Sequence, residues 1–280
     1  MLRARAVAPT LVSNAIASPT GKAVTLDPVR PNLGVDIAYQ KKLDALIARM
    51  AAAMNRAILA VYRANPPELA QDESSPAALR AAMNSLGREW AKRFDDFAEH
   101  DAKRFVRSAT GSADRAFAAS LKKAGFTVEF KMGKAASEII TAAVAENVAL
   151  IKSIPEQYLT QVEGVVMRGV AVGRDLGSVA TELQAQFGVT KRRAALIARD
   201  QNNKATAAIT RARQLEVGSA EAEWVHSAGG RKPRPTHVAN NNKKYKIAEG
   251  WLDPATDKRI WPGTEINCRC VSRTIIKGLK

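Results

Sequence analysis

The sequence contains few cysteines, histidines and aromatic residues. Its 280 residues include 2 cysteines and 3 histidines, and aromatic side chains make up only 5%. Two cysteines cannot form a disulfide framework, and a Cys-x-Cys pair is too close for an easy intrachain bridge. The count suits a reducing cytosol. No apolar run approaches the ~20 residues of a membrane-spanning helix, so we expect no membrane partner.

Acidic residues are also scarce relative to basic ones. The chain has 27 Asp and Glu against 43 Lys and Arg, which gives a formal net charge of +16. This balance favours a polyanionic partner: nucleic acid, an anionic surface or an acidic protein. A basic surface that is merely solvated is the alternative.

The composition and periodicity predict a mainly α fold, with a helical body and a small C-terminal α+β module. Apolar residues make up 46% of the chain, and alanine-rich apolar content with few aromatics favours packed helices. We expect an extended or disordered N-terminal arm over residues 1–35 and a helical body over 36–218. In residues 222–280 the helical periodicity fails, which indicates short strands in a compact module.

Within the body, several residues suggest where helices begin and end. Asp36 is a plausible N-cap for the first helix. Gly111, Pro155 and Gly188 each interrupt a helical pattern, so we expect breaks there.

The body also contains an unusual polar run. Gln201, Asn202 and Asn203 stand in mid-helix, where asparagine is unfavourable. They could hydrogen-bond the terminal module or a neighbouring chain, and an exposed position without a partner is the alternative.

Both cysteines lie near the end of the chain, as Cys268-Arg269-Cys270. With His237, and His226 as a fourth ligand, they could bind zinc, since thiolates and imidazoles are suitable ligands. Zinc sites usually separate paired cysteines by two to four residues. We therefore expect no metal and no cofactor. The alternative is that the cysteines flank one strand and pack as small apolar groups, while Arg269 clamps a carboxylate or carbonyl inside the module.

Two groups of basic residues are candidates for nucleic-acid binding. They show no base-reading motif, so we expect phosphate contacts without sequence preference. A solvated charged face is the alternative for both groups. The helix contributes Arg192, Arg193 and Arg199, and the module contributes Arg231, Lys232, Arg234, Lys243, Lys244 and Lys246.

We expect no enzymatic activity. The sequence has no nucleophile elbow, no glycine-rich phosphate loop and no HExxH motif. The competing hypotheses are a DNA-processing enzyme such as a metal-dependent nuclease, or a non-viral basic DNA-binding protein.

Three ordered segments together resemble one known family. They are residues 150–158, residues 195–204, and a terminal set formed by Trp224, His237, Trp261, Pro262, Gly263, Cys268, Arg269 and Cys270. The chain resembles the minor head, or head-morphogenesis, proteins of tailed bacteriophages, the Mu F-like family, from about residue 36 onwards. The resemblance implies a virion component that assembles in the host cytoplasm. It also implies docking to the portal, scaffold or major capsid protein, and contact with packaged double-stranded DNA.

Overall fold

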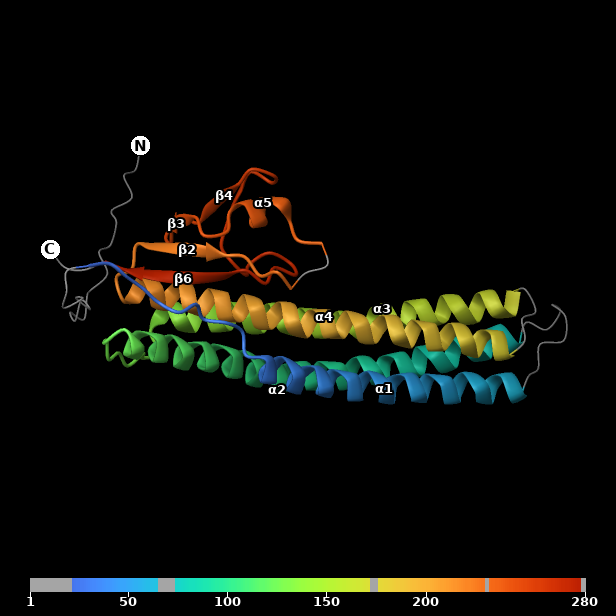
Figure 1. Cartoon of the computed structure of the whole chain (residues 1–280). Coiled ribbons are helices and arrows are strands. Elements are labelled where there is room, and N and C mark those ends of the chain that lie inside the picture. Colours follow the sequence, from blue (N-terminus) through green and yellow to red (C-terminus); the bar gives the residue numbers. More distant parts are fainter. Residues whose placement is uncertain (1–21, 65–73, 172–175, 230–231, 278–280) are drawn as a thin grey trace, which may run out of the picture.

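Four long helices lie side by side in an elongated bundle (Figure 1). The computed structural model describes residues 22–64, 74–171, 176–229 and 232–277. Successive helices run in opposite directions along the bundle, as is usual for up-and-down bundles. The helices are α1 (Leu33–Ala64), α2 (Ser74–Lys123), α3 (Lys134–Ala171) and α4 (Leu176–Glu216).

Helix α1 begins earlier than the sequence suggested. The Asn32 Oδ1 atom accepts hydrogen bonds from the backbone N–H groups of Gly34, at 2.8 Å, and Val35, at 3.4 Å. Asn32 is therefore the N-cap. The prediction that Asp36 caps this helix was wrong, because Asp36 lies inside the first turn and is buried. Burial raises the pKa of its carboxyl group.

The predicted breaks inside the body were also wrong. Helix α2 continues through Gly111, α3 through Pro155 and α4 through Gly188. A glycine costs about 1 kcal/mol and a proline about 3 kcal/mol in a helix interior. The apolar faces on both sides of Pro155 and Gly188 pack into one core cluster, and those before and after Gly111 pack into two separate clusters. That burial outweighs the local cost. Pro155 is itself buried.

The bundle core is built from aliphatic and aromatic side chains of all four helices. Leu43, Ile47, Phe94, Tyr158 and Val166 are examples, each at most 2% exposed. Tyr39 stacks on Phe105 with ring centroids 4.0 Å apart. These contacts use the three- and four-residue periodicity visible in the sequence.

The C-terminal module sits on α4 near one end of the bundle (Figure 1). The elements of the module are β2 (Glu221–Val225), α5 (Pro235–Ala239), β3 (Lys244–Lys246), β4 (Trp251–Asp253), β5 (Lys258–Ile260) and β6 (Val271–Ile276). Together with β1 (Val24–Thr25), three of these strands form an antiparallel sheet in the order β1, β6, β2, β3. Strand β4 pairs with β5 in a second, two-stranded sheet.

Strand β1 (Val24–Thr25) brings a segment from before the bundle into the module's sheet. Val24 pairs with Ile276, and Thr25 pairs with Ile275. Leu26 and Val29 are buried in a cluster that also holds residues of α2, α4 and β6. Residues 22–32 of the expected N-terminal arm are thus packed in place, while residues 1–21 lie outside the described ranges.

The observed architecture confirms the predicted fold class, mainly α with a small α+β module. Within the described ranges, no helix has the length and apolar character needed to cross a membrane.

Candidate functional site

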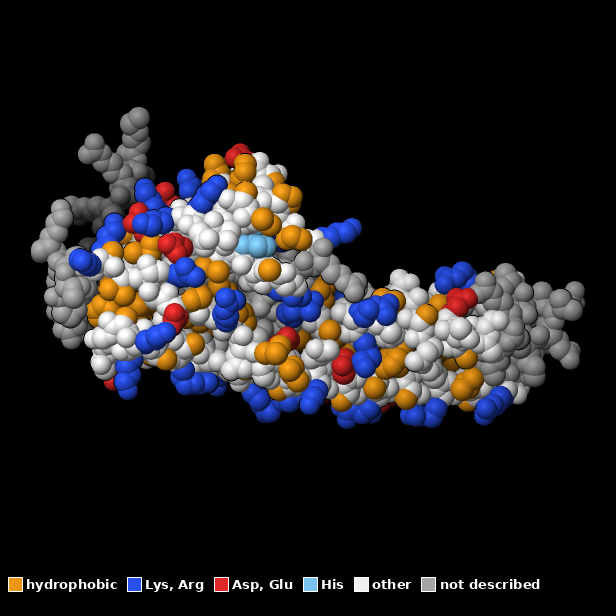
Figure 2. All heavy atoms as spheres, viewed as in Figure 1, with side chains coloured by type: hydrophobic (Ala, Val, Ile, Leu, Met, Phe, Trp, Pro, Cys, Tyr) orange, Lys and Arg blue, Asp and Glu red, His pale blue; other side chains and the backbone are white. Residues whose placement is uncertain are grey.

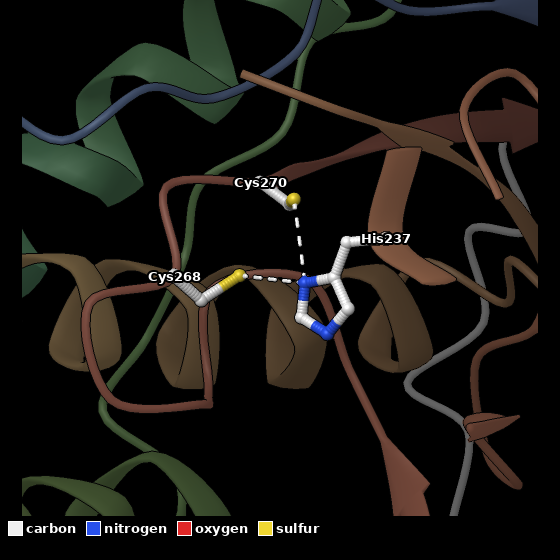
Figure 3. Close-up of side chains that lie close together, drawn as sticks. All are labelled: His237, Cys268 and Cys270. Carbon is white, nitrogen blue, oxygen red and sulfur yellow. Dashed lines mark hydrogen bonds between the residues drawn. The ribbon is translucent and has the colours of Figure 1, made fainter. Parts of the chain in front are cut away.

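The side chains of His237, Cys268 and Cys270 converge inside the module (Figure 3). The His237 Nδ1 atom lies 3.5 Å from the Cys268 sulfur and 3.8 Å from the Cys270 sulfur. All three side chains are buried. His237 comes from α5, whereas both cysteines precede β6, so the topology and not local sequence brings them together.

His226 approaches the same group from the end of β2. Its Nδ1 atom lies 3.5 Å from the Cys270 sulfur, and its side chain is half-buried. The alternative that the cysteines flank a strand was wrong in one respect, because β6 begins only at Val271 and the cysteines lie in the loop before it. Both do pack in the module's buried core, as that alternative expected. Arg269, between them, donates a hydrogen bond to the Gly229 carbonyl oxygen.

The two thiols titrate as a pair. Hydrogen bonding with the Cys270 side chain lowers the pKa of Cys268 to about 4. The same interaction, followed by burial, raises the pKa of Cys270. The lowered pKa of Cys268 and the raised pKa of Cys270 together favour a thiolate on Cys268 beside a protonated thiol on Cys270.

A group of aromatic rings surrounds the His237 side chain. Trp224 is completely buried and meets the imidazole edge-on, with ring centroids 5.1 Å apart. Trp251 makes edge-to-face contacts with both Trp224 and His237, and Tyr245 makes one with Trp224. These residues form the module's small core, which fixes the position of the imidazole.

Trp261, Pro262 and Gly263 form the turn by which the module meets α4. The Trp261 Nε1 atom donates to the Ile247 carbonyl at 2.8 Å, and the Arg211 guanidinium lies 3.7 Å from its ring centroid. Gly263 has a φ of +87°, and a Cβ atom there would stand 2.9 Å from the Ala207 Cβ atom. The glycine is required by both backbone conformation and close helix approach.

Buried polar side chains of α4 join the module to the bundle. Asn203 donates to the Cys268 carbonyl at 3.0 Å, and the Asp200 carboxylate accepts from the Asn267 backbone N–H. The Gln214 amide donates to the hydroxyl groups of Ser272 and Thr274. Sequence reasoning missed Asp200 and Gln214. The available signal was that they occupy the same face of the helix as Asn203 and Ala207.

The other two members of the polar run have partners within the body. Asn202 donates to the Asn32 carbonyl at 3.0 Å, and Gln201 donates to Glu146 at 3.0 Å. The mid-helix polar residues are therefore internal connectors.

The basic residues predicted on the helix have different surroundings. Arg192 is exposed. Arg193 donates to the Ser153 hydroxyl between helices, and burial lowers its pKa. Arg199 is half-buried, and its charge offsets part of the rise that burial causes in the pKa of Asp36. The three do not form one exposed basic face.

The basic residues predicted in the module are more exposed. Lys232, Lys243 and Lys244 are exposed, and Arg231 lies outside the described residues. Arg234 is also exposed, and it donates to the Ile266 carbonyl. The remaining residue, Lys246, pairs with Glu249 at 2.9 Å. Acidic neighbours that the sequence argument overlooked thus neutralise part of this surface.

A basic hollow that the sequence analysis missed lies along α2. Lys103, Arg104, Arg107 and Arg115 line it, together with Glu99 and His100. Only Arg104 among the four basic residues has an acidic side chain within 4.0 Å, namely Asp101, in the part of the chain that the structure describes. Figure 2 shows Lys and Arg side chains spaced along the α1–α2 edge of the bundle. The missed signal was the recurrence of basic residues on one stretch of a long helix.

In a comparison with known proteins, residues 160–273 match the family described as "Phage Mu protein F like protein". The predicted resemblance to the Mu F-like family is confirmed over this stretch. The matched stretch includes part of α3, all of α4, the cluster of His237, Cys268 and Cys270, and the first half of β6. Helix α4 and most of the module that its polar residues bind therefore lie within the matched stretch.

A relative extends the comparison. An "Uncharacterized protein" of Haemophilus influenzae (strain KW20 Rd) is 36% identical over 140 residues, which are 50% of this chain and 30% of that protein. The chain thus matches less than a third of the relative's length. No solved structure matches the chain significantly.

Proposed function

We propose that this protein is a minor component of a bacteriophage head and acts in head assembly. The Mu F-like match over residues 160–273 is the observation that carries the proposal. The role is structural: the long bundle would dock to the portal, scaffold or major capsid protein, and the protein would remain in the virion. The exposed α1–α2 face of the bundle is available for docking, because the module covers α4 instead.

Co-sedimentation with heads tests this proposal. The protein is expressed together with the other head genes of the same phage, and procapsids are separated on a gradient. We expect the protein in the particle fraction. A parallel preparation without the portal gene identifies the docking partner. If the protein docks to the portal, it will be missing from the particle fraction of this preparation. If it docks to the capsid or scaffold, it will remain there. Absence from complete particles would contradict the proposal and favour a non-viral DNA-binding protein.

We further propose that the protein contacts packaged DNA through phosphates, mainly in the α2 hollow. Its Lys103, Arg107 and Arg115 side chains have no acidic partner within ion-pair distance in the described parts of the chain. Lys243 and Lys244 of the module would contribute less, since Glu223 lies opposite Lys244 in the sheet register. Such contacts would be independent of sequence and sensitive to salt.

Two double variants separate these surfaces. Binding to a random-sequence duplex is measured by fluorescence anisotropy over a salt series. The slope of log K against log salt is negative, and each lost phosphate contact reduces its magnitude by about 0.9. We expect Lys103→Glu with Arg107→Glu to reduce the magnitude by about 2, and Lys243→Glu with Lys244→Glu to reduce it less.

The other outcomes are informative. A loss confined to the module variant would place the contact where the sequence suggested. No binding by the unmodified chain at low salt would exclude the DNA contact. Nicking of supercoiled DNA after addition of Mg²⁺ would favour the nuclease hypothesis over a structural role.

A further inference from the structure

The arrangement of nitrogen and sulfur atoms around His237 has the dimensions of a metal site. A tetrahedral zinc ion with Zn–S of about 2.3 Å and Zn–N of about 2.0–2.1 Å separates its sulfur and nitrogen ligands by roughly 3.5 Å. The three such distances here are 3.5, 3.8 and 3.5 Å. The Cys268 and Cys270 sulfurs and the His237 Nδ1 atom all lie within 4.8 Å of one another.

We propose that Cys268, Cys270 and His237 bind one structural zinc ion, and that His226, which lies near Cys270 but outside this group of three, turns inward to supply the fourth ligand. The two thiolates and two imidazoles make a neutral site when zinc is bound, so it needs no further counter-charge. Soft sulfur and imidazole ligands favour zinc over magnesium or calcium. Four protein ligands leave no open position, which is typical of structural sites and not of catalytic ones.

The far side of the His237 ring supports this assignment. Its Nε2 atom is buried, has no hydrogen-bond partner among the described residues, and lies 4.0 Å from the Asp253 Oδ2 atom. Asp253 is itself only 2% exposed, and its other oxygen accepts the Ala255 backbone N–H. Metal-binding histidines commonly direct their second nitrogen at a carboxylate, which orients the ring and fixes its tautomer. Asp253 is placed for this positioning role.

A site without metal is a poorer account of the same atoms. The His237 Nδ1 atom would be shared by two buried sulfurs, of which Cys270 also contacts His226, and a buried carboxylate would face an unsatisfied ring nitrogen. Buried polar groups without partners are costly. A zinc ion gives each sulfur and each Nδ1 atom a ligand bond and leaves the Nε2–H group for Asp253.

The positions of the proposed ligands indicate what a bound zinc ion would stabilise. They come from three segments: the end of β2, helix α5 and the turn before β6. The module has ~60 residues, a size at which a small core often needs a metal or disulfide. The core here is a few aromatic and aliphatic side chains. Zinc would fasten the three segments, and with them the turn that contacts Asn203 of α4.

Metal analysis of the full-length protein tests the site. Protein purified from zinc-supplemented medium without chelator is measured by inductively coupled plasma mass spectrometry. We expect about one zinc ion per chain. Replacing Cys268, Cys270 or His237, as Cys268→Ser, Cys270→Ser or His237→Gln, should abolish binding. Asp253→Asn should weaken it by about 10–100-fold. His100→Gln is the matched control, because His100 lies on α2 outside the cluster, and it should retain the full zinc content.

A second measurement guards against variants that fail to fold. Cobalt added to the unmodified, zinc-depleted chain should give the visible absorption of a tetrahedral site with thiolate ligands, and zinc should displace it. A zinc content near zero with no cobalt spectrum would overturn the proposal. So would a mass showing that Cys268 and Cys270 are joined by a disulfide in freshly purified protein. None of these outcomes depends on the role in head assembly.

Discussion

The substitution Arg213→Ala is expected to destabilise the protein by about 3 kcal/mol, the low end of the range for breaking a buried ion pair. The Arg213 side chain is 2% exposed and bonds both Asp114 oxygens at 2.9 Å. It also donates to the Lys131 carbonyl and to Glu216, and its guanidinium covers the Phe130 ring. Because Asp114 is 23% exposed, water can partly solvate the carboxylate left behind, which keeps the loss at the low end.

Urea unfolding followed by circular dichroism measures this loss. The control is Arg192→Ala, on the same helix but exposed, which should change the unfolding free energy by less than about 0.5 kcal/mol. Equal effects for the two variants would show that the Arg213 contacts contribute little. The prediction matters for function, because Arg213 connects α4 with α2 and with the segment before α3, next to Gln214, which bonds the module.

Gly263→Ala should destabilise the protein by about 2–5 kcal/mol. A left-handed backbone conformation costs a non-glycine residue about 1–2 kcal/mol, and forcing atoms into a packed interface costs about 1–3 kcal/mol. Both terms apply, since φ is +87° and the new Cβ atom would lie 2.9 Å from Ala207 and 3.2 Å from the Cys270 carbonyl oxygen. The module would have to move away from α4.

Gly218→Ala separates the two terms. Gly218 also has a positive φ, of +77°, but nothing lies within 4 Å of its Cβ position. It should therefore cost only about 1–2 kcal/mol. Tryptophan fluorescence reports mainly on the module, because Trp224, Trp251 and Trp261 lie there and only Trp90 lies in the bundle. For Gly263→Ala, the urea midpoint of the tryptophan fluorescence transition should decrease more than the midpoint of the circular dichroism transition, which reports on the helices. Equal losses for the two glycine variants would contradict the close packing against Ala207.

The helices could be predicted because their periodicity is a local property of the sequence. Their continuity could not, since Gly111 and Pro155 are tolerated only through burial that other helices provide. Strand β1 was missed for a related reason. It has two residues, and its stability depends on β6 and on the buried Leu26 and Val29, which local pattern does not reveal.

The candidate site was only partly visible in the sequence. The Cys268-Arg269-Cys270 spacing argues against a metal when it is judged as a linear motif. The geometry favours one, because a turn directs both sulfurs to a histidine that arrives from α5. The polar run of α4 was visible too, but whether Asn203 faced solvent or the module depended on packing.

The pairing of β1 with β6 also has a consequence for biosynthesis. Val24 leaves the ribosome early, whereas its partner Ile276 is translated only after all four helices of the bundle. The helices can associate while synthesis continues, but the edge strand and the side chains of Leu26 and Val29 must wait for their neighbours. Contacts between residues far apart in sequence form slowly, so we expect the module to close only after β6 has left the ribosome. Until then the surface of α4 that receives the module, including Asn203 and Ala207, is open to other proteins.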